Sequence, residues 1–315
     1  MRRDWPRPPA LSVSSFHFLM PLPYPPSPPA DFGFGTAYER VAIYEMLTSW
    51  IAQWQFGGKT GIEGFYDGFT GLPGLHLLPL AKAGGSVTVA CRDQAQAQAI
   101  RTIYDSHGLG DRLETLVTQD PAELAGRRFD LALLFNPFPY VENWEQFLNS
   151  VAQLSTGKLV VSVANPNSYG ALFRRGMKKL RPTGKTDLFD HPATSPKGMR
   201  QILSAFGTVE KEDYFDCPWW PDLFVEAGDS LASWLIGQIP FVKKPAPKPP
   251  APASASAEYR YGPDCYPYFE ESSPELAALR QKITGHPTFD RSAKGPLKEF
   301  FAHHRIFVVQ RPTSA

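Results

Sequence analysis

Short apolar runs alternate with helical segments from Gly61 to Pro218, and this alternation constrains the fold more than any other feature of the chain. The runs "SVTVACRD", "FDLALLFN" and "GKLVVSVAN" each predict a strand buried in a sheet. Segments of helical length follow them, such as "AQAQAIRTIYDSHGLG" and "NWEQFLNSVAQL". Strands that alternate with such helices predict an α/β fold, a doubly wound and mostly parallel sheet.

Local sequence signals predict where the first helix begins and where the second helix bends. In "TAYERVAIYEMLTSWIAQWQF" apolar residues recur at three- and four-residue steps, which predicts a helix from Thr36 onward. Thr36 and Glu39 have the spacing of a capping box, so we expect Thr36 to cap that helix. Pro79 lies inside the helix-like run "LHLLPLAKAGG" and should kink it.

The glycine-rich stretch "GIEGFYDGFTGLPGLH" precedes that run. It contains the carboxylates Glu63 and Asp67, and its glycines Gly68, Gly71 and Gly74 are three residues apart. A strand, a glycine-rich turn, a helix and a second strand begin a nucleotide-binding βαβ unit. The spacing is not G-x-G-x-x-G, so a nicotinamide-dependent enzyme is a weaker interpretation of this unit.

Proline marks two segments that we expect to lack regular structure. Residues 1–30 hold nine prolines and predict an extended or disordered arm, and "VKKPAPKPPAPASASA" at 242–257 has the composition of a linker. The piece after the linker offers one helix, "SPELAALRQKI", and one strand, "HRIFVVQRP", too little to bury a core of its own. We therefore expect residues 305–310 to join the main sheet. Residues 31–315 then form one domain, with an insertion at 218–298.

Composition excludes several classes of partner. The net charge of +1 gives no electrostatic signal for nucleic acid. The three cysteines, at 91, 217 and 265, form no C-x-x-C pair, which argues against a zinc site and a disulfide framework and fits a reducing compartment. The sequence contains no run of 18 apolar residues, so it predicts no membrane span. We expect a cytoplasmic protein whose start is Met1 or Met20.

The order of these elements resembles the class I S-adenosylmethionine-dependent methyltransferases over residues 36–217 and 296–312. "FDLALLFNPFPYVENWEQFLNSVAQLSTGKLVVSVANP" looks like the family's fourth strand, the next helix and the fifth strand. "DYFDCPWWPDLF" looks like the sixth strand, and "HHRIFVVQRP" looks like the seventh. The resemblance implies a Rossmann-like sheet of seven strands whose last strand is antiparallel and forms a reversed hairpin with the sixth. It also implies S-adenosylmethionine as the cofactor.

In this family an acidic residue ends the first strand beside a glycine-rich loop, and two registers fit the sequence. In one, "FTGLPG" aligns with "GTGLPG", so that Phe65 replaces the acid, and Asp67 and Phe69 replace two glycines. In the other, Glu63 is the acid and Asp67, Gly68 and Gly71 are the working parts of a longer loop. We prefer the second register because it keeps an acid at the strand end. Gly74 belongs to the loop in both.

The family has two further carboxylates, one for the ribose and one for the adenine amine. Cys91 stands where the ribose carboxylate would be, and Asp93 lies two residues on. Asp93 could instead cap the following helix. Asp120, in "VTQD", matches the third acid, although it could also be a cap beside Pro121.

The methyl acceptor is less well marked. "LFNPFPY" is similar in part to the N-P-P-[YFW] signature of amine methylation, in which Asn136 would contact the target amine. We count Asn136 among the cofactor-binding candidates as well, and the alternative is a proline-rich turn from strand to helix. His191, in "DLFDHPATSP", is the best candidate for a general base, although it could be a surface loop residue. His303 and His304 should point to opposite sides of the last strand, so we expect no metal site there.

The aromatic segments "CPWWPDLF" and "YRYGPDCYPYF" of the insertion could line a small-molecule pocket, contact a protein partner or pack as a satellite cluster. The leading hypothesis is a methyltransferase that acts on an unidentified small molecule, without nucleic acid or membrane as partner. The alternative is a methyltransferase-like binding or scaffold protein without activity, which Cys91 and Phe69 favour. A nicotinamide-dependent Rossmann enzyme ranks third.

Overall fold

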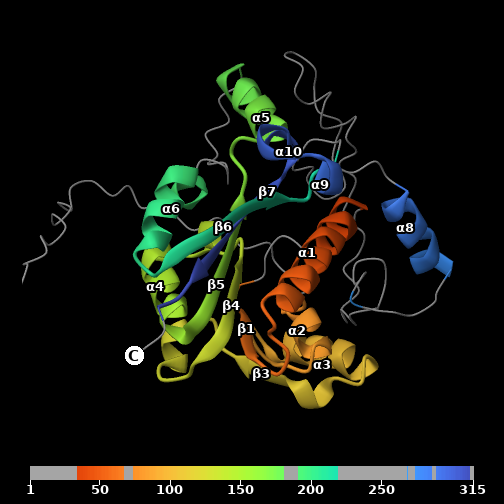
Figure 1. The fold of residues 1–315 in the computed structure, drawn as a ribbon, viewed down its shortest axis with the longest axis vertical. Coiled ribbons are helices and arrows are strands. Elements are labelled where there is room, and N and C mark those ends of the chain that lie inside the picture. Colours follow the sequence, from red (N-terminus) through yellow and green to blue (C-terminus); the bar gives the residue numbers. More distant parts are fainter. Residues whose placement is uncertain are drawn as a thin grey trace, which may run out of the picture.

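A single sheet of seven strands organises the chain (Figure 1). The computed structural model describes residues 34–66, 74–180, 191–218, 268, 274–285 and 289–312. The strand order is β3-β2-β1-β4-β5-β7-β6. The strands are β1 (Thr60–Gly64), β2 (Ser86–Cys91), β3 (Leu113–Val117), β4 (Phe129–Phe135), β5 (Ser155–Ala164), β6 (Thr208–Phe215) and β7 (His304–Gln310).

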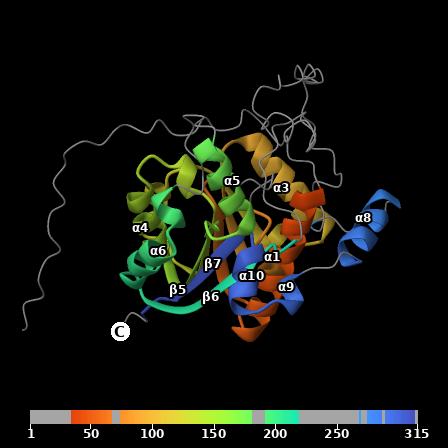
Figure 2. The same cartoon turned by 90° about the horizontal axis from the view of Figure 1, so that it is seen from above.

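Helices cover both faces of the sheet, as Figure 2 shows from above. On one side lie α1 (Phe34–Gln53), α2 (Leu78–Lys82) and α3 (Gln94–Ser106), and on the other α4 (Trp144–Leu154) and α6 (Pro196–Ser204). The remaining described helices are α5 (Tyr169–Leu180), α8 (Pro274–Thr284), α9 (Phe289–Ser292) and α10 (Gly295–Phe301). The architecture is therefore the predicted α/β doubly wound sheet.

Alternation along the strands divides the core into two layers. In β4, Leu131, Leu133 and Phe135 face the α1–α3 side. Ala132 and Leu134 face the α4–α6 side. Side chains on a strand point to opposite faces in turn, so a continuous apolar run supplies both layers at once.

The last strand joins this sheet as expected. β7 runs antiparallel to both of its neighbours, and Val308 lies opposite Val160 of β5 and Lys211 of β6. The strands β3, β2, β1, β4 and β5, in this spatial order, pair in parallel. This arrangement confirms the reversed hairpin of the sixth and seventh strands in a seven-stranded, Rossmann-like sheet.

Two local predictions were wrong. The first helix begins at Phe34, so Thr36 lies inside it and cannot be its cap, and Glu39 serves another purpose. The second helix begins only at Leu78, which places Pro79 in its first turn. A proline there loses no helical hydrogen bond, so no kink follows.

Several predicted features lie outside the described residues. They are the arm at 1–30, the linker at 242–257, the loop residues Asp67, Gly68, Phe69 and Gly71, and the aromatic segments 219–224 and 259–269 apart from Tyr268. No helix within the described ranges combines the length and the apolar composition that a membrane crossing requires.

Candidate functional site

Strained backbone marks the carboxyl ends of the parallel strands. Three residues other than glycine have positive φ just after a strand: Phe65 after β1 (71°), Asn136 after β4 (51°) and Asp216 after β6 (56°). Side chains seldom adopt this region, and strain of this kind gathers at functional sites. Doubly wound sheets also bind their ligands at this edge. The edge is therefore the candidate site.

Glu63 is buried near the end of β1 and holds the turn that leads into α2. One carboxylate oxygen accepts hydrogen bonds from the N–H groups of Gly74 (3.1 Å) and His76 (3.3 Å) and contacts His76 Nδ1. The other accepts from the Leu77 N–H at 2.9 Å. Glu63 thus supplies an acceptor for N–H groups at the start of α2, where a negative charge is favourable.

Gly74 is a residue that this turn requires. Its φ is +84°, and a Cβ there would lie 2.3 Å from Val89 Cγ1. A larger residue would therefore force the turn away from both β2 and the Glu63 carboxylate. Its predicted role in the glycine-rich loop is thus, in this structure, to let the chain pass close to the sheet.

Polar groups without a partner surround Glu63. The atoms His76 Nε2, Tyr104 Oη and Tyr268 Oη are buried and have no hydrogen-bond partner among the described residues. Burial raises the pKa of Tyr104 well above its usual value, and the nearby Glu63 and Tyr268 add to this. An unsatisfied buried polar group costs about 1–3 kcal/mol. These groups therefore fit a polar ligand at this end of the edge.

Stacked rings link the Glu63 end of the edge to a second polar group. His76 stacks on Phe135 with 4.4 Å between ring centroids, and Phe135 lies 5.7 Å from His304. His304 in turn stacks on Phe215 at 5.0 Å. The carboxyl ends of β1, β4 and β6 and the start of β7 thus form one continuous site.

The second group, which we call the His304 cluster, consists of Glu39, Asn136, Asp216, His303 and His304. His304 Nε2 lies 2.9 Å from Glu39 Oε1 and 3.8 Å from Asp216 Oδ2. Its other ring nitrogen, Nδ1, lies 2.8 Å from the Asn136 side-chain nitrogen. All five residues are buried. The predicted amine-binding Asn136 thus contacts His304 at the end of β4.

The expectation that His303 and His304 diverge was wrong. His303 Nδ1 lies 2.9 Å from the same Asp216 oxygen that faces His304. His303 precedes β7, so strand alternation does not apply to it. Burial raises the pKa of the Asp216 carboxyl to about 6, and His303 opposes this rise. A carboxyl with a shifted pKa at a strand end is a common property of functional sites.

The predicted ribose-binding residues have structural contacts. The Asp93 side chain accepts the Gln96 N–H at 2.8 Å as the cap of α3, and this bond lowers its pKa. Cys91 is buried at the end of β2, and its sulfur lies 3.5 Å from the Val89 carbonyl. The cap that we weighed for Asp93 is present, and its role at a ribose stays a prediction.

Asp120 is exposed after β3, and its side chain accepts the Ala122 N–H at 2.9 Å at the start of a short 3-10 helix. Burial raises the pKa of Tyr66, and the Asp120 charge adds to the rise. The adenine contact of Asp120 stays a prediction.

His191 is half-buried beside α4. Its Nδ1 accepts the Ala193 N–H at 3.1 Å, and its ring lies edge-on to Trp144 at 5.7 Å. Burial lowers its pKa from 6.5 to about 4. The lone pair that a base needs is thus already engaged, and a group with this pKa is a weak base. The predicted catalytic role of His191 stays a prediction without support from these contacts.

The comparisons with known proteins give matches among solved structures, at low sequence identity. No protein-family model matches the chain, and no curated protein matches it. Solved structures do match, among them a magnesium protoporphyrin IX methyltransferase from Synechocystis PCC 6803. Its TM-score is 0.44 at 18% identity, over 55% of this chain and 75% of its own.

Two further matches have the same level of similarity. The [4+2]-cyclase SpnF has a TM-score of 0.41 at 13% identity, over 86% of this chain and 81% of its own. A methyltransferase from Aquifex aeolicus has a TM-score of 0.37 at 14% identity, over 54% of this chain and 84% of its own. Such low similarity carries no argument about a reaction. It is the strand order of the chain, with its reversed hairpin, that resembles the class I methyltransferases.

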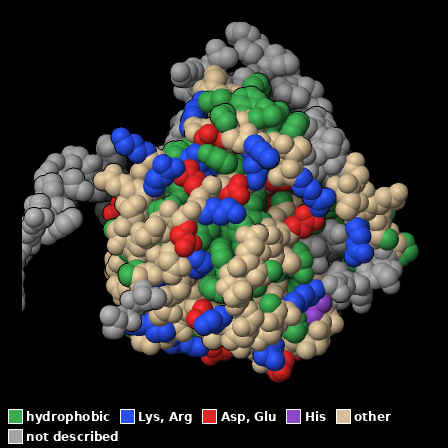
Figure 3. Space-filling model, viewed as in Figure 1, with side chains coloured by type: hydrophobic (Ala, Val, Ile, Leu, Met, Phe, Trp, Pro, Cys, Tyr) green, Lys and Arg blue, Asp and Glu red, His purple; other side chains and the backbone are tan. Residues whose placement is uncertain are grey.

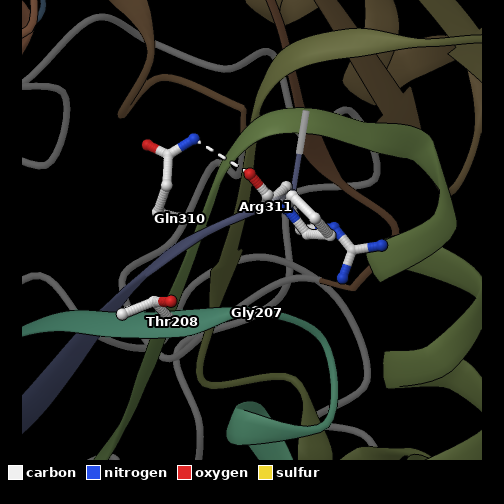
Figure 4. A pocket seen from close by; sticks show the side chains of 5 residues that line it. Gly207, Thr208, Gln310 and Arg311 are labelled. Atoms are coloured by element: carbon white, nitrogen blue, oxygen red, sulfur yellow. Dashed lines mark hydrogen bonds between the residues drawn. The ribbon is translucent and has the colours of Figure 1, made fainter. Parts of the chain in front are cut away.

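Two surface features are separate from the residues of the His304 cluster. A hollow of about 310 Å³ is lined by Gly207, Thr208, Gln310, Arg311 and Pro312, at the start of β6 and the end of β7 (Figure 4). The hollow therefore lies at the amino ends of the parallel strands, opposite the candidate site. Exposed apolar side chains of α5 and α10 gather at the top of Figure 3, namely Leu172, Phe173, Leu297 and Phe300.

Proposed function

We propose that this chain is an S-adenosylmethionine-dependent methyltransferase that acts on a small molecule. The observation that carries the proposal is Glu63 at the end of β1, where it holds the turn into α2 in a sheet with a reversed β6–β7 hairpin. An acid at this position beside a glycine-rich loop is what the resemblance implies for cofactor binding. The unsatisfied atoms of His76, Tyr104 and Tyr268 fit a polar ligand beside it.

S-adenosylmethionine, when bound, supplies an activated methyl group on a sulfonium, so the protein contributes mainly position. Glu63 acts through the loop, because its oxygens contact backbone N–H groups of the turn. We propose that Asp67, Gly68 and Gly71 form the loop surface, that Asp93 and Asp120 serve the ribose and adenine, and that Asn136 orients the acceptor from the end of β4.

Calorimetric titration with S-adenosylmethionine and its demethylated product tests this proposal. We expect saturable heat from the full chain and weaker binding by Glu63→Ala, by about 1–3 kcal/mol, because the turn loses a charged acceptor. Glu63→Gln keeps an acceptor oxygen and is the matched control, with circular dichroism to confirm that each variant is folded. The proposal is wrong if the wild-type chain gives no heat with either compound.

A second candidate function is a binding or scaffold protein with this fold. The observation in its favour is Cys91, which is buried where the family has a ribose carboxylate. A thiol is a poor acceptor for ribose hydroxyls. The same titration separates the two functions, since a scaffold that has lost the cofactor site binds neither compound.

A further inference from the structure

The His304 cluster brings three metal-ligating side chains together from distant parts of the chain. Oxygens of Glu39 and Asp216 and a ring nitrogen of His304 all lie within 4.8 Å of one another. These residues come from α1, the end of β6 and the start of β7. We propose that they bind one divalent transition-metal ion. The proposal rests on this set of atoms and does not depend on the proposed methyl transfer.

The charge of the cluster supports a cation. Glu39 and Asp216 are 8% and 3% exposed, and the same His304 nitrogen faces both carboxylates, at 2.9 and 3.8 Å. His303 Nδ1 also pairs with that Asp216 oxygen at 2.9 Å, whereas Glu39 Oε1 forms no hydrogen bond with any described residue. Buried charges require pairing. Asp216 Oδ1 has no hydrogen-bond partner in the described part of the chain. A divalent ion between the three side chains would compensate both charges.

Asn136 provides an independent observation on the other side of the His304 ring. Its amide is 3% exposed and lies 2.8 Å from His304 Nδ1, and its Oδ1 atom has no partner among the described residues. The oxygen and nitrogen of an amide can exchange places by rotation. The rotated amide would accept a hydrogen from Nδ1, which leaves the lone pair on Nε2, toward Glu39 and Asp216.

This arrangement is the usual support for a metal-bound histidine, whose other ring nitrogen donates to an oxygen of a second residue. Two members of the cluster, Asn136 (φ 51°) and Asp216 (φ 56°), have a strained backbone. Strain of this kind is typical of ligand-binding sites. One imidazole and two carboxylates suit zinc, iron, manganese or cobalt better than calcium or magnesium, which prefer oxygen alone.

Metal titration of the full chain after treatment with a chelator tests the site. We expect saturable binding of one Zn²⁺ or Co²⁺ per chain, with a higher melting temperature, and no comparable effect of Mg²⁺. Glu39→Gln should weaken Zn²⁺ binding by more than about 10-fold. Its melting temperature without metal should stay the same or rise, because Gln removes a buried charge. If Glu39 has a structural role alone, Glu39→Gln should keep the Zn²⁺ affinity and lower the melting temperature without metal.

Asp216→Asn is the second variant, because Asn tolerates the left-handed backbone at that position. It should also lose Zn²⁺ affinity, whereas His191→Asn, a histidine change outside the cluster, should keep wild-type affinity. The Co²⁺ absorption spectrum of the wild-type chain requires no variant, and a spectrum other than that of the hydrated ion would support the site. Wild-type affinity in both cluster variants, or no saturable binding by the wild-type chain, would overturn the proposal.

Discussion

Phe65, Asn136 and Asp216 each turn the chain at the end of a strand through a backbone conformation that side chains seldom adopt. At Asn136 and Asp216 the turn brings a polar side chain against His304, whereas the ring of Phe65 packs into the core against Phe147. A strained residue costs of the order of 1–3 kcal/mol. The contacts of the two polar residues are thus maintained at a cost to stability.

His191 should make the stability of the protein depend on pH. Its pKa falls from 6.5 to about 4 in the folded state, so the unfolded chain binds the proton first as the pH is lowered. The contribution of His191 is complete above pH 6.5 and should be lost progressively between pH 6.5 and 4. The slope for one proton is at most about 1.4 kcal/mol per pH unit, and partial exposure of the ring reduces it.

Urea denaturation at several pH values, on the wild type and on His191→Asn, measures this contribution. The Asn side chain can still accept the Ala193 N–H but does not titrate in this range. We expect the stability of the variant to fall less steeply between pH 6.5 and 4. Parallel curves for the two proteins would contradict the expectation.

At the scale of elements, α2 shows why a helix boundary decides the effect of a proline. Pro79 follows Leu78, the first residue of the helix, so it has no intrahelical bond to lose. Two positions later the Ala81 N–H donates to the Leu77 carbonyl at 3.3 Å. The same residue type would therefore be harmful there.

A pair of variants tests this difference. We expect Ala81→Pro to lower the free energy of unfolding by about 3 kcal/mol or more, because it removes that bond and collides with the preceding turn. Pro79→Ala should cost about 1 kcal/mol, mainly through greater freedom of the unfolded chain. Chemical denaturation gives both values, and equal losses for the two variants would place the start of α2 elsewhere.

Strands β4, β5 and β7 were predictable from the sequence because each is a short apolar run that supplies both core layers, as "FDLALLFN" does for β4. The helix boundaries were less so. Thr36 and Glu39 have capping-box spacing, but tertiary contact places Glu39 against His304. Helix α5 was not predicted, although its sequence "YGALFRRGMKKL" has apolar residues at three- and four-residue steps.

At the scale of the whole molecule, the segment after the linker is tied to the rest at several points. Leu276 and Ile283 of α8 pack with Ala37 and Tyr38 of α1. The Tyr38 hydroxyl also donates to the Asp290 carboxylate at 2.5 Å. We therefore expect deletion of residues 245–257 to leave the melting temperature nearly unchanged, provided that the new ends can be joined. A large drop in a thermal melt would show that the linker contributes to the fold.

The site was only partly predictable for a reason that also belongs to this scale. Glu63 was identifiable because it ends a strand beside a glycine-rich turn. Glu39, His76 and His304 lie in different segments, and no local spacing relates them. The fold brings Glu39 to within 2.9 Å of His304. This contact follows from the position of β7 between β5 and β6, which no short sequence pattern indicates.

The central position of β7 has a consequence for synthesis on the ribosome. Among the described strands, β6 pairs with β7 alone, and β7 is translated long after it. A nascent chain that has emerged as far as Phe215 therefore carries an edge at β5 without its neighbour, and a sixth strand without a place in the sheet. Exposed strand edges of this kind favour association between chains. Until β7 emerges, the growing polypeptide would benefit from a chaperone that shields the open side of β5.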